Sequence, residues 1–425
     1  MSPRTPGRAA ALAAAALAIA TAAPATAAPP ATAAPPPTAA RPAGAVPDIP
    51  TGAHLHRRPI ARAANLPYGG GPVLHSNRAY LIFWQPAGSG LSFDPGYVAT
   101  VETFLARVAA DSRKPTNVYG LTGQYRDAAG PAAYDSTYGG ALLATDQLPP
   151  NGCIEPPLTG PGWGVCLNDS QLQDEITHQV GIHGLPMGPT DVYFLLTPNG
   201  FGSCTDATST NCALGGDAGG YCGYHAATSF GLLYAVIPYN AVAGHCQSGN
   251  PRPNASTADP SISSLSHEHN ETITDPFDSA WVDSSGQEDG DLCADQFGRE
   301  LPGAGGSSAF NELIAGGRYF LQEEWSNDDG SCQQRDEPDS ITFHAPARAV
   351  ARRPVTLSAA ALDPDGAIVS YAWFFGDGRS AHGRRPTHTF KRAGAYRVVL
   401  RTTDSAGNYA FYARVIRVHG APHHH

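Results

Sequence analysis

The sequence lacks several features that define common classes of protein. After the N-terminal segment, no apolar run approaches the ~18 residues that a membrane-spanning helix needs. There is no C-x-x-C pair, which argues against a cysteine-rich structural zinc site, and no G-x-S-x-G motif, which argues against a nucleophile-elbow serine hydrolase. Lysines are few and the net charge is −10, so nucleic acid is not an expected partner.

The N-terminus is typical of a secretory signal peptide. Arg4 and Arg8 precede an alanine-rich apolar segment (residues 9–22), and residues 25–28 offer an A-x-A cleavage site. We therefore expect residues 1–28 to be removed and the mature protein to be secreted to the extracellular space, without a membrane span.

Composition divides the rest of the chain into three parts. Residues 29–64 are rich in proline and alanine and have no periodic apolar pattern, which predicts a semi-extended linker without a fold of its own. Residues 65–335 contain all the cysteines and most of the acidic residues, whereas residues 340–420 carry twelve Lys and Arg against four Asp and Glu. This change of charge predicts a boundary between two folded domains.

The eight cysteines are an even number in a chain that we expect to be exported, which predicts disulfides. No cysteine is then left over to act as a nucleophile. Short spacings favour local pairs, although spacing alone leaves the connectivity open. The favoured pairs are Cys153–Cys166, Cys204–Cys212, Cys222–Cys246 and Cys293–Cys332.

The acidic part contains four segments with a clear apolar pattern. The segments AYLIFWQ (79–85), DVYFLLT (191–197) and LLYAVIPY (232–239) suit buried strands. YVATVETFLARVAADSR (97–113) has apolar residues at helical spacing. We predict an α+β domain with one mixed sheet, one long helix packed on it and disulfide-stapled loops.

The basic C-terminal part has a rhythm of short strands divided by Asp/Gly turns. Its motifs are DPDG (363–366), YAWFFGDG (371–378), PTHTF (386–390), AGAYRVVL (393–400) and DSAGN (404–408). On these motifs residues 340–420 resemble a PKD (polycystic kidney disease) domain, with a departure at Phe374, where the family usually has Asp or Asn. The resemblance implies an immunoglobulin-like β-sandwich that serves as a spacer or weak adhesion module.

The candidate chemistry lies in the stretch LSHEHNETITDP, residues 265–276. Asp259 as N-cap and Pro260 as first helical residue predict that a helix begins just before this stretch. Pro276 predicts its end, because the residue before a proline is disfavoured in helical geometry.

Two residues of this helix are spaced as metal ligands. His267 and Glu271 lie four positions apart, so their side chains share one helix face at about 5–6 Å. This suits two ligands of one zinc ion, as in the H-E-x-x-H motif, with Glu271 in place of the second histidine. Glu268, one step round the helix, is the candidate catalytic base that takes a proton from water. His269 falls on the opposite face and is expected to be a core histidine.

A catalytic zinc ion needs a third protein ligand. The loop after the helix (residues 281–293) is dense in carboxylates, and zincins with a glutamate as third ligand place it about twenty positions after the second. Glu288 follows Glu271 by 17 positions and is the favoured third ligand; Asp291, 20 positions on, is the alternative. Because carboxylates outnumber histidine, a metal other than zinc remains an alternative.

Other interpretations of the helix stay open. The H-E-x-x-E pattern alone also fits the solvated face of a surface helix, and the EDGD run (288–291) with Asp275 could hold a structural calcium ion. Context favours a catalytic metal, since in zincins the strand before the active helix lines the cleft and pairs with extended substrate through its edge. We expect structural roles for His225 and Tyr319.

Several motifs resemble the secreted phosphate-induced, EXORDIUM-like family and its bacterial relatives. They are GGPVLHSNRAYLIFW (70–84), CGYH (222–225), YAVIPY (234–239), LSHEHNETITDP, the E-x-x-D-x-C run (288–293) and YFLQEEWSN (319–327). The resemblance covers residues 66–332 and implies an extracellular or wall-associated protein with a zincin-like core. Relatives tend to have an apolar residue where this chain has His269, which fits a face that does not bind metal.

Together these patterns predict a secreted zinc-dependent hydrolase, a metallopeptidase-like enzyme with a PKD spacer or adhesion domain. Its expected substrate is an extracellular protein, a peptide or cell-wall material, and it is expected to be monomeric by default. The alternative is a non-catalytic extracellular protein of the EXORDIUM-like kind, associated with wall or glycan, in which the metal site is degenerate or structural.

Overall fold

The computed structural model describes most of the chain after residue 64, together with a three-residue strand before it. The described ranges are 45–47, 65–114, 116–154, 163–208, 211–214, 220–298, 300–301, 306–335, 339–362, 367–404 and 409–420. The expected signal peptide and most of the expected linker lie outside them. Among the described helices, none has the length and apolar character needed to cross a bilayer.

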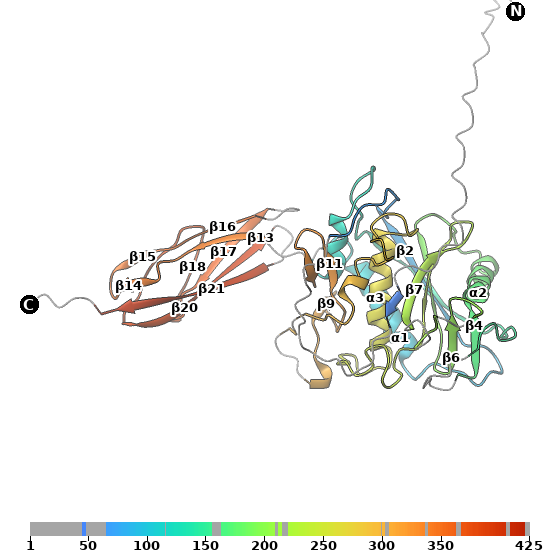
Figure 1. Ribbon diagram of the computed structural model, residues 1–425. Coiled ribbons are helices and arrows are strands. Elements are labelled where there is room, and N and C mark those ends of the chain that lie inside the picture. Colours follow the sequence, from blue (N-terminus) through green and yellow to red (C-terminus); the bar gives the residue numbers. More distant parts are fainter. Residues whose placement is uncertain are drawn as a thin grey trace, which may run out of the picture. The chain divides into compact units, whose positions relative to one another are not determined.

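The first folded region is built on a mixed sheet with helices on both faces (Figure 1). In its described part the strand order is β1-β7-β8-β5-β2-β3; β8, β5, β2 and β3 run parallel, β7 runs antiparallel to β8, and β1 antiparallel to β7. The strands are β1 (Ala45–Pro47), β2 (Asn77–Trp84), β3 (Ser136–Ala144), β5 (Asp191–Leu196), β7 (Tyr221–Ala227) and β8 (Leu233–Ile237).

Side chains of the central strands alternate between two cores, as expected for a sheet covered on both faces. Leu81 and Phe83 point to the face covered by α1 (Tyr97–Ala110) and α3 (Asp259–Thr274). Ile82 points to the other face, which α2 (Asp169–Ile182) covers. The predicted mixed α/β region is thus confirmed at this level: the two predicted helices, α1 and α3, are present, and α2 is a further helix that was not predicted.

Sequence reasoning missed α2 because its buried apolar stripe is narrow. Leu172, Ile176 and Val180 pack on the sheet, while most of the remaining positions are polar. A capping box at Asn168 and Gln171 begins the helix, and this was the stronger signal in the sequence.

The strand before α3 is not an edge strand, which corrects the expectation that its edge would be free for substrate. β8 pairs with β5 on one side and with β7 on the other. The antiparallel strand β7 therefore stands nearer the edge of the sheet. Within the expected linker, residues 45–47 form β1, which pairs with β7.

Shorter elements and four disulfides complete this region. The elements are η1 (Val118–Gln124), β4 (Val165–Asn168), β6 (Phe201–Cys204), η2 (Asp291–Cys293), η3 (Gly306–Ser308), β9 (Glu312–Ile314), β10 (Gly317–Tyr319), β11 (Glu324–Ser326) and β12 (Ser331–Gln333). The disulfides are the favoured pairs, Cys153–Cys166, Cys204–Cys212, Cys222–Cys246 and Cys293–Cys332, and no cysteine is free.

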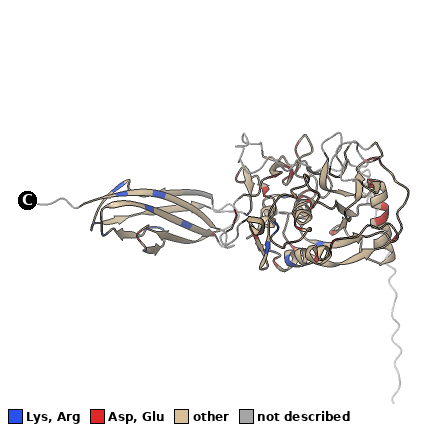
Figure 2. Ribbon diagram, turned by 90° about the horizontal axis from the view of Figure 1, so that it is seen from below, with Lys and Arg blue, Asp and Glu red and all other residues tan. Residues whose placement is uncertain are grey.

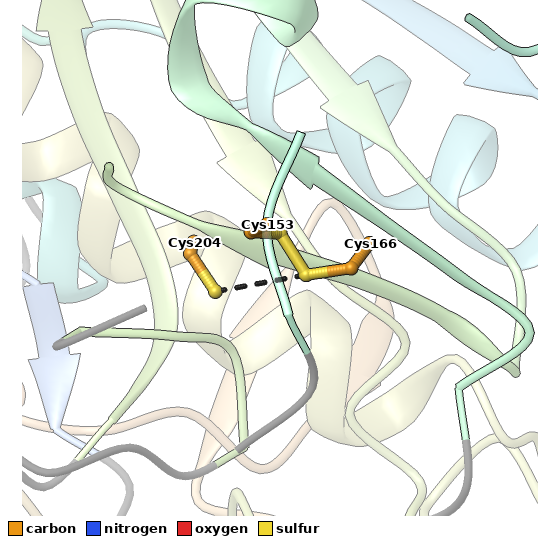
Figure 3. A group of neighbouring side chains, drawn as sticks. All are labelled: Cys153, Cys166 and Cys204. Atoms are coloured by element: carbon orange, nitrogen blue, oxygen red, sulfur yellow. Dashed lines mark hydrogen bonds between the residues drawn. A yellow bond between two sulfur atoms is a disulfide. The ribbon is translucent and has the colours of Figure 1, made fainter. Parts of the chain in front are cut away.

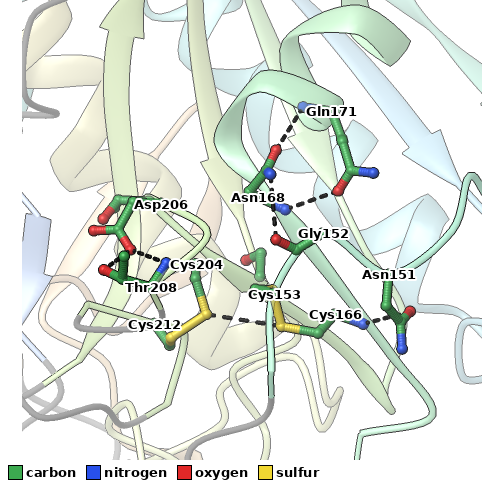
Figure 4. Close-up of a disulfide and its surroundings, with 12 residues drawn as sticks. Asn151, Gly152, Cys153, Cys166, Asn168, Gln171, Cys204, Asp206, Thr208 and Cys212 are labelled. Carbon is green, nitrogen blue, oxygen red and sulfur yellow. Dashed lines mark hydrogen bonds between the residues drawn. A yellow bond between two sulfur atoms is a disulfide. The ribbon is translucent and has the colours of Figure 1, made fainter.

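Three of the cysteines lie close enough together to suggest a metal site at first sight (Figure 3). Cys166 Sγ lies 3.7 Å from Cys204 Sγ. Both sulfur atoms are already bonded in disulfides, so neither is a thiolate available to a metal. The Cys153–Cys166 bond ties residue 153 to β4, and the Cys204–Cys212 bond ties β6 to residue 212. β4 and β6 themselves pair in parallel next to the cap of α2 (Figure 4).

The C-terminal region is rich in β-strands. Its larger sheet has the order β14-β21-β20-β17-β18, and β13 pairs with β16 and β15 with β19. Trp373 is fully buried in its core, and Lys and Arg positions lie along these strands (Figure 2). The strands are β13 (Asp339–His344), β14 (Arg348–Val350), β15 (Pro354–Thr356), β16 (Ser358–Leu362), β17 (Ile368–Phe374), β18 (Ser380–His382), β19 (Thr387–Thr389), β20 (Gly394–Asp404) and β21 (Tyr409–His419).

Candidate metal centre

The helix that carries the candidate site, α3, is polar in sequence but buried along all its 16 residues. It begins one residue earlier than expected, with Ala258 as N-cap, while the Asp259 carboxylate accepts hydrogen bonds from Asn254 and the Ser256 amide. It ends at Thr274, and Asp275, the residue before Pro276, lies outside helical geometry (φ −151°, ψ 71°), as predicted. A buried helix with so many polar groups requires partners from the surrounding elements.

His269 faces the core, as predicted from its position on the helix. Its Nε2 lies 2.9 Å from Asn77 Oδ1, and its ring makes T-shaped contacts with the rings of Tyr119 and Phe194. Burial lowers the pKa of His269 to about 3, so the ring is neutral. It does not join the other histidine of the motif.

His267 and Glu271 converge on one point, as their spacing predicts. His267 Nε2 lies 2.9 Å from Glu271 Oε1, yet this nitrogen has no hydrogen-bond partner of good geometry among the described residues. Two atoms that bind one tetrahedral zinc ion at about 2.0–2.1 Å stand about 3.3 Å apart. The separation is therefore close to what a shared cation requires.

The structure brings Asp291 to these two residues, rather than the favoured Glu288. Asp291 Oδ1, in η2, lies 3.6 Å from His267 Nε2, and the Asp291 amide donates to Glu271 Oε1 at 3.1 Å. Glu288 is directed to a second histidine, with its Oε2 3.7 Å from His225 Nε2. Asp291, the alternative third ligand, thus forms with His267 and Glu271 one group that could hold a metal ion. A second such group is formed by His225, Glu268 and Glu271.

The loop that carries Asp291 packs directly on the His267 ring. A Cβ on Gly290 would lie 2.6 Å from His267 Nδ1, so only glycine permits this approach. Gln322 Nε2 lies 2.8 Å from His267 Nδ1 and donates to the Gly290 carbonyl at 2.8 Å. If Nε2 is to bind a metal, Nδ1 must carry the proton. Gln322 must then turn its amide oxygen toward the ring, and this oxygen has no hydrogen-bond partner in the described part of the chain.

His225 belongs to the site, although the sequence predicted only a structural role for it. In the sheet register it pairs with Ala235 of β8, which places it in the row of side chains that faces α3. His225 Nδ1 lies 3.3 Å from Glu268 Oε2 and 3.5 Å from Glu271 Oε2, and its Nε2 lies 3.2 Å from the Asp275 carbonyl. The ring therefore bridges the candidate base and a candidate ligand.

Gly223, two residues before His225, lets β7 approach the helix. A Cβ at this position would lie 2.9 Å from Glu268 Oε1. β7 thus passes directly over the candidate base. Because Gly223 has no side chain, there is room for the Glu268 carboxylate.

Acidic side chains dominate the surroundings of the two histidines. Among the described residues we define the acidic cluster as Glu268, Glu271, Asp275, Glu288, Asp289, Asp291 and Glu324, all of which are buried. Oxygen atoms of five of them have no hydrogen-bond partner in the described part of the chain: Glu271 Oε2, Asp275 Oδ2, both of Glu288, Asp289 Oδ2 and both of Glu324.

Burial and mutual repulsion shift the protonation of this cluster. Burial raises the pKa of Glu268, Asp289 and Asp291 to about 7 each, and raises the pKa of Glu288 well above its usual range. Glu271 behaves differently: burial alone would raise its pKa, but the neighbouring histidines, His267 foremost, lower it.

The histidines respond in the opposite sense. Burial alone would lower the pKa of His225, but hydrogen bonds and charge from Glu268 and Glu271 raise it well above the usual value. Two histidines cannot neutralise seven carboxylates, so the cluster must hold protons or a cation. A divalent cation fits this site for two reasons. The described residues leave several carboxylate oxygens and His267 Nε2 without hydrogen bonds, and His267, Glu271 and Asp291 supply one imidazole and two carboxylates as ligands.

The disulfide Cys293–Cys332 anchors η2, which carries Asp291. Its sequence separation is 39, and in the chain-entropy model such a link stabilises the fold by about 4 kcal/mol. We expect the double substitution C293S/C332S to lower the free energy of unfolding by about this amount and to weaken zinc binding at least tenfold, because Asp291 loses its anchor. Denaturant titration and calorimetric zinc titration measure the two effects.

The matched control is C204S/C212S, which removes a disulfide far from α3 in sequence with a separation of 8. Its expected loss of stability is about 2.5 kcal/mol in the same model, with zinc affinity unchanged. Equal weakening of zinc binding in both variants would show that the Cys293–Cys332 bond has no particular role at the site.

The C-terminal region matches a known family. The family model described as PKD domain matches residues 323–415. This part of the chain is therefore a PKD domain. The match begins at residue 323, before the predicted boundary at 340, whereas the strands of the C-terminal sheets begin with β13 at Asp339.

Curated relatives match over short stretches. Collagenase ColQ1 of Bacillus cereus (strain Q1) is 49% identical over 45 residues, 11% of this chain and 5% of that protein. The pre-pro-metalloprotease PrtV of Vibrio cholerae is 41% identical over 56 residues, 13% of this chain and 6% of that protein. These matches concern the PKD region, so they do not extend to α3. The chain thus covers about a twentieth of the length of these relatives.

Among solved structures, the PKD1 domain from the Vibrio cholerae metalloprotease PrtV is 29% identical and covers 19% of this chain and 94% of that chain, with a TM-score of 0.17. The PKD1 domain of Vibrio anguillarum Epp is 28% identical and covers 20% of this chain and 99% of that chain, with a TM-score of 0.18.

Multiple disulfides and a PKD domain are typical of secreted proteins.

Proposed function

We propose that this chain is a secreted, zinc-dependent hydrolase of proteins or peptides, with the PKD domain as a spacer or adhesion module. The observation that carries the proposal is the convergence of His267, Glu271 and Asp291 on one point, beside buried carboxylate oxygens that have no hydrogen-bond partner among the described residues. A polar helix held wholly inside a domain costs stability, and a bound cation would offset that cost.

In this proposal His267, Glu271 and Asp291 hold the metal ion, and Glu288 is the alternative for the third position. A bound zinc ion supplies a Lewis acid that polarises a carbonyl group and makes water more acidic. Glu268 is the base: its carboxylate takes a proton from the attacking water and delivers it to the leaving nitrogen as the C–N bond breaks. The pKa of about 7 that burial gives Glu268 suits both steps near neutral pH.

His225 has a positioning role in the proposed reaction. Its Nδ1 faces the carboxylates of both Glu268 and Glu271, at 3.3 and 3.5 Å, while the Asp275 carbonyl holds its other nitrogen. A protonated His225 orients the base and stabilises its ionised form before proton transfer.

The variant Glu268→Gln tests the reaction without disturbing the shape of the site. We expect it to retain one zinc ion per chain and to cleave labelled casein at least about a hundredfold more slowly, because an amide cannot take the proton. Metal analysis and the rate of casein cleavage give the two readings. Glu175→Gln, a buried glutamate of α2 bonded to Gln179, is the matched control and should keep both.

A second function is favoured by one specific observation, the complete burial of Glu268 and Glu271. A site that substrate cannot reach suits a structural cation, zinc or calcium, in a non-catalytic extracellular protein such as the EXORDIUM-like resemblance implies. If the cation is bound and no form of the chain, including one in which β1 is released from β7, shows casein cleavage that depends on Glu268, this second function stands and the hydrolase proposal fails.

A further inference from the structure

The N-terminal strand β1 occupies the edge of the sheet beside the candidate metal centre. In its described part the sheet ends with β1, which runs antiparallel to β7. The register places Ala45 opposite Tyr224, Val46 opposite Gly223 and Pro47 opposite Tyr221. Without this strand, the backbone of β7 would present an unpaired edge.

That edge lies over the candidate base. β1 pairs with β7 at Gly223, the residue whose missing side chain leaves room for Glu268. β1 also lies beside α3 and η2, the two elements that carry His267 and Asp291, and it is the short blue strand between α3 and β7 in Figure 1. The β1 backbone runs along β7 and contacts η2, and Glu268 has no exposed surface with it in place.

Open space continues where the pairing ends. A pocket borders His225, and its walls are formed by the end of β7, by residues that follow α3, and by Asp169 and Gln173 of α2 with Tyr234 of β8. Its lining includes His225, Ala226, Ala227, Thr228, Pro276 and Phe277. An extended chain paired with β7 would therefore run past the candidate base and reach this pocket.

We propose that the edge of β7 is a docking edge for an extended peptide, and that residues 45–47 occupy it as an internal peptide that blocks the site. This rests on the proposed function and names its substrate class as extended polypeptide. Strand addition uses main-chain hydrogen bonds, so it selects an extended backbone and tolerates many side chains. Because β1 belongs to the same chain, it competes with a free peptide at a high effective concentration and occupies the edge of β7 until β1 is released.

The full chain with the double substitution A45P/V46P tests the inference. Proline has no amide hydrogen and cannot donate to a neighbouring strand, so β1 should leave β7. With zinc present we expect the variant to cleave labelled casein at least tenfold faster than wild type. A synthetic peptide of residues 44–50 should bind the variant, inhibit it and bind wild type at least tenfold more weakly. A39P/A40P, with the same change outside β1, should behave as wild type.

The outcomes separate the two proposals. If wild type and A45P/V46P cleave casein equally in a Glu268-dependent manner and the peptide binds neither, the docking edge is overturned and the hydrolase stands. If no form cleaves casein although zinc is bound, the hydrolase falls, and binding of the peptide to the variant alone still supports the edge. Peptide binding to neither form overturns it.

Hydrogen exchange on the wild-type chain gives a reading that needs no variant to fold. Slow amide exchange within residues 45–46 and their partners on β7 is expected from the pairing. Exchange at residues 45–46 as fast as in an unfolded peptide would overturn the inference.

Discussion

Replacing His267 with alanine should abolish stoichiometric zinc binding. His267 supplies the one imidazole of the proposed ligand set, and its Nε2 lies 2.9 Å from Glu271 Oε1 and 3.6 Å from Asp291 Oδ1. Its loss leaves two carboxylates, which prefer harder cations. We expect zinc affinity, measured by calorimetric titration, to fall at least a hundredfold, and casein cleavage to be lost with it.

The same helix offers a matched control. His269 is as buried as His267, but it bonds to Asn77 on the opposite face. His269→Gln should cost stability through its core contacts and leave the zinc stoichiometry at that of wild type. Equal loss of zinc in the two variants would mean that unfolding, rather than ligand removal, explains the result.

The third ligand can be assigned by a pair of isosteric substitutions. Asp291→Asn should weaken zinc binding at least tenfold, because Asp291 is the carboxylate nearest to His267 Nε2 after Glu271. Glu288→Gln should change the affinity only a few-fold, because Glu288 is directed to His225. The reverse order would assign the position to Glu288.

Much of the fold could be predicted from local pattern. The strand around Leu81 and the helix that begins at Tyr97 have strong apolar periodicity, and both formed where that pattern placed them. α2 was missed because its apolar stripe is only one residue wide per turn. The order of strands was not predictable in this way, since pairing β8 between β5 and β7 depends on long-range contacts.

In the candidate site, too, residues related by local spacing could be predicted from the sequence, and residues brought in by long-range contacts could not. His267, Glu268 and Glu271 are related by helical spacing, which a sequence shows directly. His225 and Gln322 reach the same place from a strand and a loop, so neither has a sequence signal until the register of β7 and the path of the chain after β10 are known. A spacing of about twenty positions fits Asp291 better than Glu288, but sequence spacing does not show which of two carboxylates on one loop turns toward His267.

Removal of the cation should make the protein less stable as pH rises from 5 to 8. In the metal-free fold, burial raises the pKa of Asp289 from 3.8 to about 7, so the folded state keeps a proton that the unfolded chain has already lost. Such a group contributes stability below its unfolded pKa, and this contribution is lost as pH rises through the folded pKa. Between pH 5 and pH 7 this single carboxyl accounts for about 2–3 kcal/mol.

The other raised groups act in the same direction. Burial is the main cause in both cases: it raises the pKa of Asp291 to about 7 and the pKa of Glu324 well above its usual range. Since 1 kcal/mol corresponds to about 2–4 °C in a domain of this size, the Tm of chelator-treated protein should fall by at least about 5 °C from pH 5 to pH 8. Differential scanning calorimetry measures this directly.

Two comparisons connect this fall to the acidic cluster. Saturating zinc binds the ionised carboxylates and should remove most of the pH dependence, because metal binding displaces the protons that the cluster otherwise keeps. Asp289→Asn removes one titrating group outside the proposed ligand set and should raise the metal-free Tm at pH 8, where the native carboxylate is ionised and unpaired at Oδ2. A metal-free Tm that rises from pH 5 to pH 8 would show that these carboxyls are solvated, and the buried cation site could not then be as described.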